Sequence, residues 1–381
     1  MSSVTTFSGR DPATGKGLKV IVEGDCIVNI QPTNYTGNQW LSAGLIDLQV
    51  NGFSGIDLND GAVDPERLLA LAHSLLSLGI TTFLPTLITA SFEQVHDTLK
   101  VISRARLEHP LLARMIPCIH LEGPSISPDD GPRGAHPAVH VRPPDLQEFD
   151  AWQQACEGVI GLVTLSPHWE NSSEFIQRLT AQGVHVSIGH THADHQQISA
   201  AVAAGARLST HLGNGASAMM PRHPNAIWSQ LADEQLSATF IADGHHLPAE
   251  TFKSMLRAKG LSKSILVSDA AAPGGLQPGT YQQYIGGNVV LDEDGRLGIE
   301  GTPYLAGAAR PLSDCVATAI SLAGISLADA LTLATVNPGY FIGRSGRLAP
   351  GEPADIISFS WEPGRKTLDI HQVVIGGNLF A

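Results

Sequence analysis

The chain has 381 residues, 43% of them hydrophobic and 15% charged, and its formal net charge is −13. This acidic balance argues against nucleic acid and anionic membranes as partners, because both are bound through basic patches. The length exceeds that of a typical single domain and suits an α/β barrel of about 250 residues with a smaller second module.

The four cysteines, Cys26, Cys118, Cys156 and Cys315, are far apart and form no CxxC pair. This pattern predicts no structural disulfide and favours a reducing, cytoplasmic location. The N-terminus has no signal-peptide pattern, and no apolar run reaches the roughly 18 residues of a membrane span.

Both ends of the chain are rich in strands and turns. Residues 17–30 read as a β-hairpin with its turn at Glu23-Gly24-Asp25, and residues 355–360 and 367–380 have a similar texture. We therefore expect a small β-sandwich module from residues 1–43 and 344–381, with a barrel from residues 44–343 inserted between its halves.

The middle of the chain alternates strand patterns with helical ones. Eight segments read as strands: 44–50, 80–87, 115–123, 159–167, 184–190, 206–212, 236–243 and 264–270. Helical patterns occupy residues 64–79, 91–106, 194–205 and 249–260, and two more follow at 314–324 and 326–335. A Gly- and Pro-rich loop with a hairpin near 288–297 precedes these last two. The alternation predicts a (β/α)8 barrel.

Residues 184–211 contain two histidines at equivalent positions. His190 and His211 each follow a short strand, with an Ala-rich helix between them that Gly205 closes. Parallel α/β folds place their chemistry at the carboxyl ends of strands. Either histidine alone could be an ordinary surface residue, but the repeated position indicates a metal-binding pair.

Two carboxylates occupy matching positions on other strands. Glu122 ends the strand segment 115–123, and Glu122, His190 and His211 form a His₂Glu set that suits a catalytic Zn²⁺ or a similar divalent ion with a bound water. Asp269 ends the last strand segment, where it could take a proton from that water and pass it to a leaving amine. The alternative for Asp269 is a helix cap or an ordinary loop residue.

Several segments together resemble the amidohydrolase superfamily and, within it, the N-acetylglucosamine-6-phosphate deacetylase family. The similarity spans roughly residues 44–359, and each motif alone is weak, whereas their shared order is specific. The motifs are Gly44–Gly52, His120–Pro124, Gly189-His190, Thr210–Asn214, Ile241–Gly244 with His246, Val267–Ala270, Asn337-Pro338 and Gly346–Asp355.

The resemblance implies a barrel that hydrolyses the N-acetyl amide of an amino sugar phosphate, releasing acetate. Glu122, His190 and His211 match the metal ligands, and Asp269 matches the general base and acid. His136 matches a histidine that holds the substrate and polarises its carbonyl, whereas His120 is not a family ligand and should be structural.

The metal count follows from the first strand. Many amidohydrolases have two histidines there that bind a second metal, and this chain has Gln49 and Asn51 instead. Amides are poor transition-metal ligands compared with imidazole. We therefore expect one divalent ion per subunit, Zn first, with Fe, Mn or Co as alternatives.

The resemblance also indicates how a sugar phosphate would be bound. Asn214, Gly215 and His246 match residues at the phosphate end. Arg222 matches an arginine that reaches across from a partner subunit, which implies a homodimer; a surface arginine is the alternative.

This chain departs from the family pattern around the sugar. It has Gly213 where the family commonly has an aromatic residue, and His245 is an additional histidine. His192 and His195 lie near His190, and we expect both to be solvent-exposed. The exact substrate therefore stays open: an unphosphorylated or differently configured N-acyl sugar or small amide is one alternative, and a catalytically inactive oligomeric scaffold is another.

Overall fold

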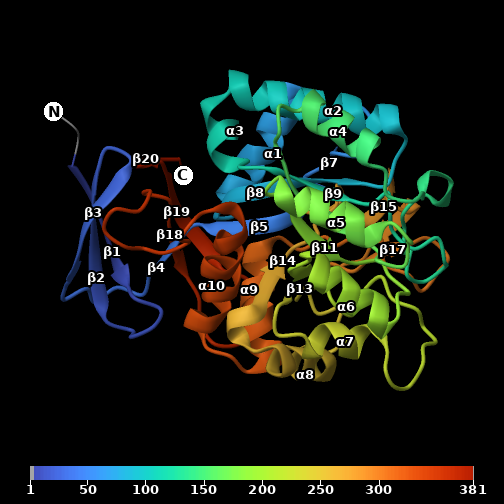
Figure 1. Ribbon diagram of the computed structural model, residues 1–381. Coiled ribbons are helices and arrows are strands. Elements are labelled where there is room, and N and C mark those ends of the chain that lie inside the picture. Colours follow the sequence, from blue (N-terminus) through green and yellow to red (C-terminus); the bar gives the residue numbers. More distant parts are fainter. Residues whose placement is uncertain (1–3, 381) are drawn as a thin grey trace.

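The computed structural model describes residues 4–380 as a barrel and a separate antiparallel sheet built from both ends of the chain (Figure 1). The α/β class and the (β/α)8 barrel predicted from the sequence are confirmed. The barrel strands are parallel and hydrogen-bonded in chain order: β5 (Leu45–Val50), β8 (Ile80–Ile88), β9 (Ile119–Glu122), β10 (Ile160–Leu165), β11 (His185–Ile188), β12 (Leu208–Ser209), β13 (Ser237–Ile241) and β14 (Ser264–Val267).

The barrel closes between its first and last strands. Val50 forms a parallel bridge with Ala270, and the Asp269 amide donates to the Gln49 carbonyl at 3.1 Å. Nearby, buried Asp47 accepts hydrogen bonds from the backbone amides of Gln49 and Ser268. The seam therefore brings the end of β5 beside the end of β14.

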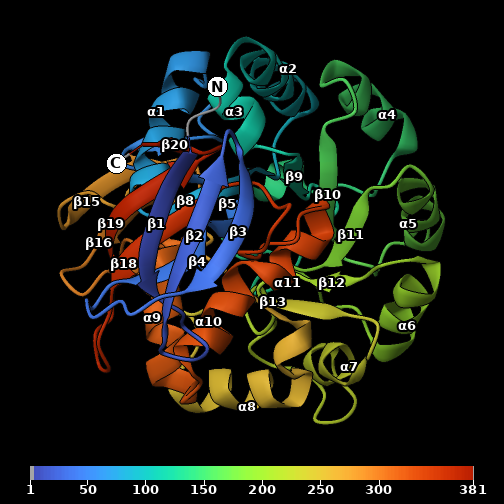
Figure 2. The same cartoon turned by 90° about the vertical axis from the view of Figure 1, so that its left-hand side faces the viewer.

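Helices form a ring around the barrel, which Figure 2 shows from the side of the terminal sheet. They are α1 (Pro65–Ser77), α2 (Phe92–Glu108), α3 (Pro110–Met115), α4 (Leu146–Ala155), α5 (Ser172–Ala181), α6 (His195–Ala204), α7 (Ala226–Ala232), α8 (Ala249–Lys259), α9 (Leu312–Ala323), α10 (Leu327–Ala334) and α11 (Val336–Gly339). The largest apolar cluster lies between these helices and the strands, and a second one, with Ile46, Leu48 and Leu84, includes residues of the barrel strands. None of the helices in residues 4–380 has the length and apolar character needed to cross a membrane.

Helix α6 shows how local sequence fixes the two loops that carry the histidines. Asp194 caps its first turn in a reciprocal pair with Gln197, and Gly205 ends it with a φ of 122°. A capping box and a glycine at the end define both helix boundaries. The loop before α6 and the strand after it are thereby held at set positions on the barrel rim.

Two predicted strands differ most from their expected lengths. The segment predicted at 115–123 begins only at Ile119, because Pro110 starts the additional helix α3, which runs to Met115. The segment predicted at 206–212 is a strand only at Leu208–Ser209. Its backbone leaves the extended conformation by His211, where φ is 28°.

The terminal sheet joins strands from both ends of the chain. Its order is β20 (Asn378–Leu379), β19 (Asp369–Ile375), β18 (Ile356–Ser360), β4 (Trp40–Ala43), β1 (Val4–Arg10), β2 (Gly17–Glu23) and β3 (Cys26–Pro32). The antiparallel pairing of β4 with β18, over four residue pairs, joins the two halves, and Val20, Leu41 and Ile356 share one small core. A separate β module from both termini is therefore present, as one seven-stranded sheet, while its exact boundaries at residues 43/44 and 343/344 stay a prediction.

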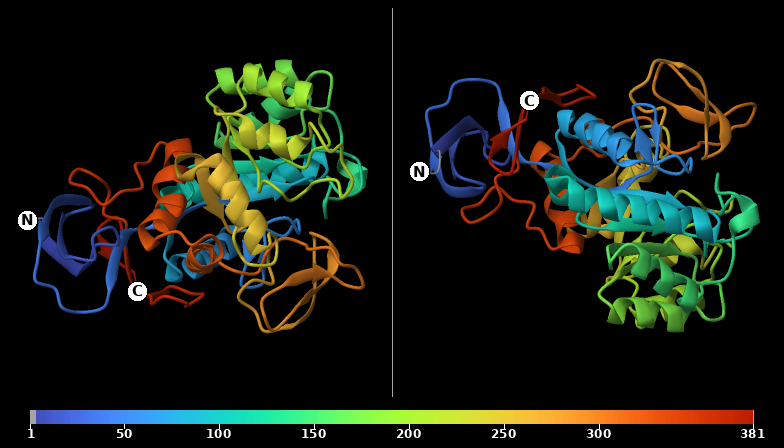
Figure 3. Two further views of the ribbon diagram at one scale, coloured as in Figure 1. Left: turned by 90° about the horizontal axis from the view of Figure 1, so that it is seen from below. Right: turned by 90° about the horizontal axis from the view of Figure 1, so that it is seen from above.

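The terminal sheet and an inserted sheet lie at opposite ends of the barrel (Figures 1 and 3). The inserted sheet contains β15 (Gly279–Gln283), β16 (Gly287–Leu291) and β17 (Leu297–Ile299), which confirms the predicted hairpin; a small ribbon, β6 (Gly52–Phe53) and β7 (Ile56–Asp57), follows β5. Because β4 leads directly into β5, the terminal sheet lies at the amino ends of the barrel strands. All four cysteines are free thiols, as expected.

Candidate active site at the carboxyl ends of the barrel strands

The four residues singled out at strand ends lie together inside the barrel mouth. Glu122 is the last residue of β9, and His190, His211 and Asp269 each lie two residues beyond β11, β12 and β14. Their exposed fractions are only 2%, 7%, 3% and 8% in that order. We call these four residues the strand-end cluster.

Two imidazoles converge on one carboxylate oxygen in this cluster. Oε1 of Glu122 is 3.0 Å from Nε2 of His211 and 3.3 Å from Nε2 of His190. The two Nε2 atoms are themselves 3.1 Å apart. Three potential ligand atoms from three separate strands therefore surround one point.

Three members of the cluster have strained backbones. φ is 47° at His190, 28° at His211 and 52° at Asp269, in the left-handed region that non-glycine residues rarely adopt. Each such conformation costs about 1–3 kcal/mol and persists only where the surrounding structure enforces it. Strain of this kind is typical of functional sites.

The cluster fits a tetrahedral divalent metal ion. With metal–nitrogen bonds of about 2.0–2.1 Å, ligand atoms on a tetrahedron are separated by roughly 3.3 Å, close to the separations of 3.0–3.3 Å found here. Nδ1 of His190 is 2.8 Å from the Pro132 carbonyl, the type of contact that fixes a metal-bound imidazole. Nδ1 of His211 is buried and has no hydrogen-bond partner among residues 4–380.

The two amides of the first strand bind the carboxylates directly. Nε2 of Gln49 donates to Glu122 at 2.9 Å and to Oδ1 of Asp269 at 3.0 Å, and Nδ2 of Asn51 donates to the same Oδ1 at 2.7 Å. Both residues at the predicted second-metal position are therefore engaged in hydrogen bonds to these carboxylates. They fix one oxygen of Asp269.

The charges of the cluster depend on each other. Burial alone would raise the pKa of Glu122, but the hydrogen bonds and charges of His190 and His211 lower it well below the usual value. Burial lowers the pKa of His190, and Glu122 outweighs that effect and raises it. Burial and the charge of Glu122 raise the pKa of Asp269 to about 6. Asp269 is therefore a stronger base than an ordinary aspartate.

His136 also reaches this centre. Its Nδ1 lies 2.9 Å from the Thr89 hydroxyl and its Nε2 lies 3.7 Å from Oε2 of Glu122. Burial and the nearby His190 lower the pKa of His136 to about 3, so its ring is neutral. Glu122, His136 and His190 offer ligand atoms within 4.8 Å of one another, which makes His136 a further candidate ligand.

His120 is structural, as expected. It is buried within the barrel, with Nε2 2.8 Å from the Thr164 hydroxyl and Nδ1 3.1 Å from the Leu48 carbonyl. Burial lowers its pKa to about 4, so the ring is a neutral link between strands.

The residues predicted at the phosphate end are only partly brought together. The Asn214 side chain donates to the His211 carbonyl, and Gly215 packs so closely on His190 that a Cβ would come within 2.7 Å of Nδ1. His246 follows β13, and its charge interacts with that of Asp269. Arg222 is exposed on the loop of residues 213–225, with no side-chain hydrogen bond or ion pair within residues 4–380.

His192 and His195 are exposed, as expected. His192 contacts Ser127, and Nδ1 of His195 is 3.1 Å from the Ser229 hydroxyl. His245 reaches the Asp294 carbonyl at 3.2 Å. None of these three histidines is part of the strand-end cluster.

Two partners of site residues were missed from the sequence. Oδ2 of Asp243 lies 2.7 Å from Nδ1 of His246. The position of Asp243 in the motif Ile241–Gly244, three residues before His246, is the sequence feature that could have identified it. Thr89, which contacts His136, lies in an ordinary strand-end position and carries no signal of its own.

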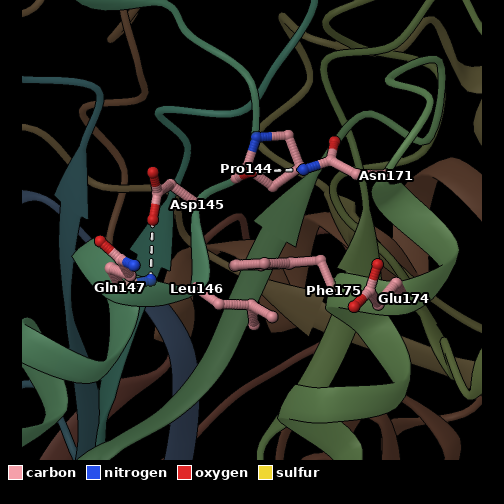
Figure 4. Close-up of a pocket in the computed structure, with 7 residues that line it drawn as sticks. All are labelled: Pro144, Asp145, Leu146, Gln147, Asn171, Glu174 and Phe175. Atoms are coloured by element: carbon pink, nitrogen blue, oxygen red, sulfur yellow. Dashed lines mark hydrogen bonds between the residues drawn. The ribbon is translucent and has the colours of Figure 1, made fainter.

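A separate surface cavity of about 330 Å³ lies at the start of α4 and α5 (Figure 4). Pro144, Leu146 and Phe175 form its apolar part, and Asp145, Gln147, Asn171 and Glu174 complete the lining. It contains no member of the strand-end cluster and no histidine, so it is not the candidate active site.

Comparison with known proteins places the chain in a family. Residues 40–380 match the Amidohydrolase family. The chain is 33% identical over 325 residues to N-acetylglucosamine-6-phosphate deacetylase of Bacillus subtilis, covering 84% of this chain and 80% of the relative. It is 34% identical to N-acetylgalactosamine-6-phosphate deacetylase of Shewanella sp., and the match covers 83% of this chain and 78% of that relative.

A solved structure agrees with this assignment. N-acetyl-D-glucosamine-6-phosphate deacetylase from Mycobacterium smegmatis superposes with a TM-score of 0.86 and 25% sequence identity, over 96% of each chain. The chain therefore belongs to the amidohydrolase family and, within it, to the family of N-acetylglucosamine-6-phosphate deacetylases.

Proposed function

We propose that the protein hydrolyses the N-acetyl amide of an N-acetylated amino sugar 6-phosphate, with N-acetylglucosamine-6-phosphate as first candidate, to the free amine and acetate. The observation that carries this proposal is the convergence of Nε2 of His190 and His211 on Oε1 of Glu122. Asp269 lies beside them, linked to Glu122 through the Gln49 amide. The names of the relatives support the choice of substrate.

Glu122, His190 and His211 would hold one divalent metal ion, with Zn²⁺ the first candidate because two imidazoles and a carboxylate suit it. The ion would lower the pKa of a bound water towards neutrality and polarise the acetyl carbonyl. The amides of Gln49 and Asn51 favour one ion over two.

Asp269 would act as general base and then as general acid. Its Oδ1 is fixed by the amides of Gln49 and Asn51, which leaves Oδ2 to accept the proton of the attacking water and deliver it to the departing amine. Burial raises its pKa, which favours uptake of the proton by this carboxylate.

His136 would bind the acetyl carbonyl. Its ring is neutral, and the Thr89 hydroxyl at Nδ1 leaves Nε2 as the nitrogen that can donate. A fixed donor that meets negative charge as it develops on the carbonyl oxygen stabilises the transition state.

The 6-phosphate would be bound by Asn214, Gly215 and His246, with Arg222 supplied by the second subunit of a homodimer. Exposed apolar side chains near Arg222 support a subunit contact: Met219 is 90% exposed and Trp228 is 53% exposed. Sedimentation of the purified protein would show whether it is a dimer.

The deciding experiment measures acetate release from four substrates: N-acetylglucosamine-6-phosphate, its galacto epimer, and both sugars without phosphate. We expect kcat/KM to be highest for a phosphorylated sugar, and the Shewanella relative makes the galacto epimer the second candidate. Faster release from an unphosphorylated sugar would reject the phosphate requirement. A metal-loaded protein that releases no acetate from any of the four would contradict the proposed reaction.

A further inference from the structure

Asp243 organises the turn that carries His246. It lies two residues beyond β13, and its Oδ1 accepts the backbone amides of His245 at 2.8 Å and His246 at 2.9 Å. Its Oδ2 is 2.7 Å from Nδ1 of His246. One buried carboxylate therefore fixes both the backbone and the imidazole ring.

This contact determines which nitrogen of His246 remains for a ligand. Nδ1 is occupied by Asp243, and Nε2 has no hydrogen-bond partner within residues 4–380. The His246 side chain is only 8% exposed and that of Asp243 only 2%. Because β13 neighbours β14 in the barrel, the turn lies next to the loop of Asp269.

We propose that Asp243 is a positioning residue that fixes the orientation of the His246 ring, so that Nε2 of His246 donates to the anionic end of the substrate. This inference rests on the proposed function, which supplies a phosphorylated sugar. It adds a residue that touches no substrate atom and acts only through the histidine.

Electrostatics agree with this geometry. Burial alone would lower the pKa of His246, but the hydrogen bond and charge of Asp243 raise it, and the more distant Asp269 adds to that effect. Burial would raise the pKa of Asp243, yet His246 lowers it to about 2. The Cys315 thiol of α9 also faces Asp243. Burial raises its pKa well above the usual value, so this thiol stays neutral and adds no charge to the pair. Each member of the pair therefore favours the charged form of the other.

The test compares wild type with Asp243→Asn. The amide keeps an oxygen for the two backbone donors and removes the negative charge beside Nδ1. Asp97→Asn is the matched control, because Asp97 also lies beside a histidine, His96 at 3.1 Å, but is 77% exposed on α2. Three kinds of measurement are made. The first gives KM and kcat for the phosphorylated and for the unphosphorylated sugar. The others are the NMR titration of His246 and the response of its signal to inorganic phosphate.

We expect Asp243→Asn to raise KM for the phosphorylated sugar by about tenfold or more, since a hydrogen bond to a charged group is lost. Its kcat and its KM for the unphosphorylated sugar should change little. The imidazole should titrate at lower pH, and inorganic phosphate should be bound about tenfold more weakly. Asp97→Asn should behave as wild type.

An unchanged His246 titration in Asp243→Asn would overturn the inference. An equal rise in KM for the phosphorylated and the unphosphorylated sugar would also overturn it. If wild type hydrolyses no amino sugar, the proposed function fails separately. The titration and the binding of inorganic phosphate then still decide whether Asp243 controls an anion-binding histidine.

Discussion

The strand-end cluster and the 213–225 loop are adjacent in the barrel mouth but are built in opposite ways. Glu122, His190 and His211 are buried, with their ligand atoms held within 3.3 Å of Glu122 Oε1. In the loop, Met219 is 90% exposed and Arg222 has no side-chain partner within residues 4–380. The cluster is attached to hydrogen-bonded strands, whereas the loop connects β12 to α7.

We expect this difference to separate the residues that carry out the chemistry from those that select the substrate. Proton transfer and metal binding require atoms fixed to fractions of an ångström, which strands and buried hydrogen bonds provide. Recognition of a sugar epimer or a phosphate can vary through loops without disturbing that geometry. Mutations in the cluster should therefore abolish turnover, and mutations in the loop should alter KM.

The largest effect is expected from Glu122→Gln. The amide is a poorer ligand than the carboxylate, so the protein should lose most of its metal and its activity together. Metal analysis of the purified variant, beside an acetate-release assay, checks both. Full metal content in Glu122→Gln would remove Glu122 from the ligand set.

Asp269→Asn should separate metal binding from proton transfer. We expect turnover to fall by about 10²–10⁴-fold, the usual contribution of a general base, while metal content stays at the wild-type level. Near-normal kcat in this variant would exclude Asp269 from the mechanism.

Asp243→Asn should show its stability effect only in a limited pH range. Because the pKa of His246 is raised in the folded state, its interaction with Asp243 stabilises the fold fully below the unfolded-state pKa of 6.5. This stabilisation is lost as the pH rises through the folded-state pKa. Because the pKa of Asp243 is lowered in the folded state, this carboxylate stabilises the fold above pH 3.8. That stabilisation is lost as the pH falls towards about 2. The variant should lose about 2 kcal/mol of unfolding free energy near pH 5, and less once the pH has risen through the folded-state pKa of His246. A loss independent of pH, measured by urea unfolding, would contradict this.

Gly213→Ala tests the departure of the loop from the family pattern. Gly213 has a φ of 100°, and a Cβ there would come within 3.0 Å of Leu247 and 3.2 Å of Met255. We expect a loss of about 1–2 kcal/mol from the backbone alone, with the contacts adding to it. Gly260→Ala, at a φ of 81° with open space around it, is the control for the backbone term. Equal melting temperatures of the two variants would show that the contacts cost nothing.

Arg222→Ala should have the smallest effect on the fold. An exposed side chain without partners contributes within about 0.5 kcal/mol, so the melting temperature should not move. KM for the phosphorylated sugar should rise while kcat stays constant, and Arg178→Ala, on the exposed face of α5, should change neither. An unaltered KM in Arg222→Ala would show that Arg222 is an ordinary surface residue with no part in substrate binding.

Sequence patterns predicted the elements more reliably than their ends. Turn signals and apolar periodicity identified all eight barrel strands, but the third of them was placed too early because α3 ends only at Met115. The ligand candidates were identified because each lies at the end of a strand, a position that sequence spacing reveals. Asp243 was missed because a carboxylate three residues before a histidine is common and gains meaning only when its oxygen is found 2.7 Å from Nδ1.

The sequence by itself determined the barrel, the terminal module and the residue types available at the strand ends, because periodicity and turn residues are local properties. Only the tertiary structure decided that Gln49 bridges Glu122 and Asp269, that three cluster residues adopt positive φ, and that Asp243 holds His246. These contacts join residues from different strands or depend on side-chain direction. They arise only when the barrel closes, between Val50 and Ala270, and brings the strand ends to one point.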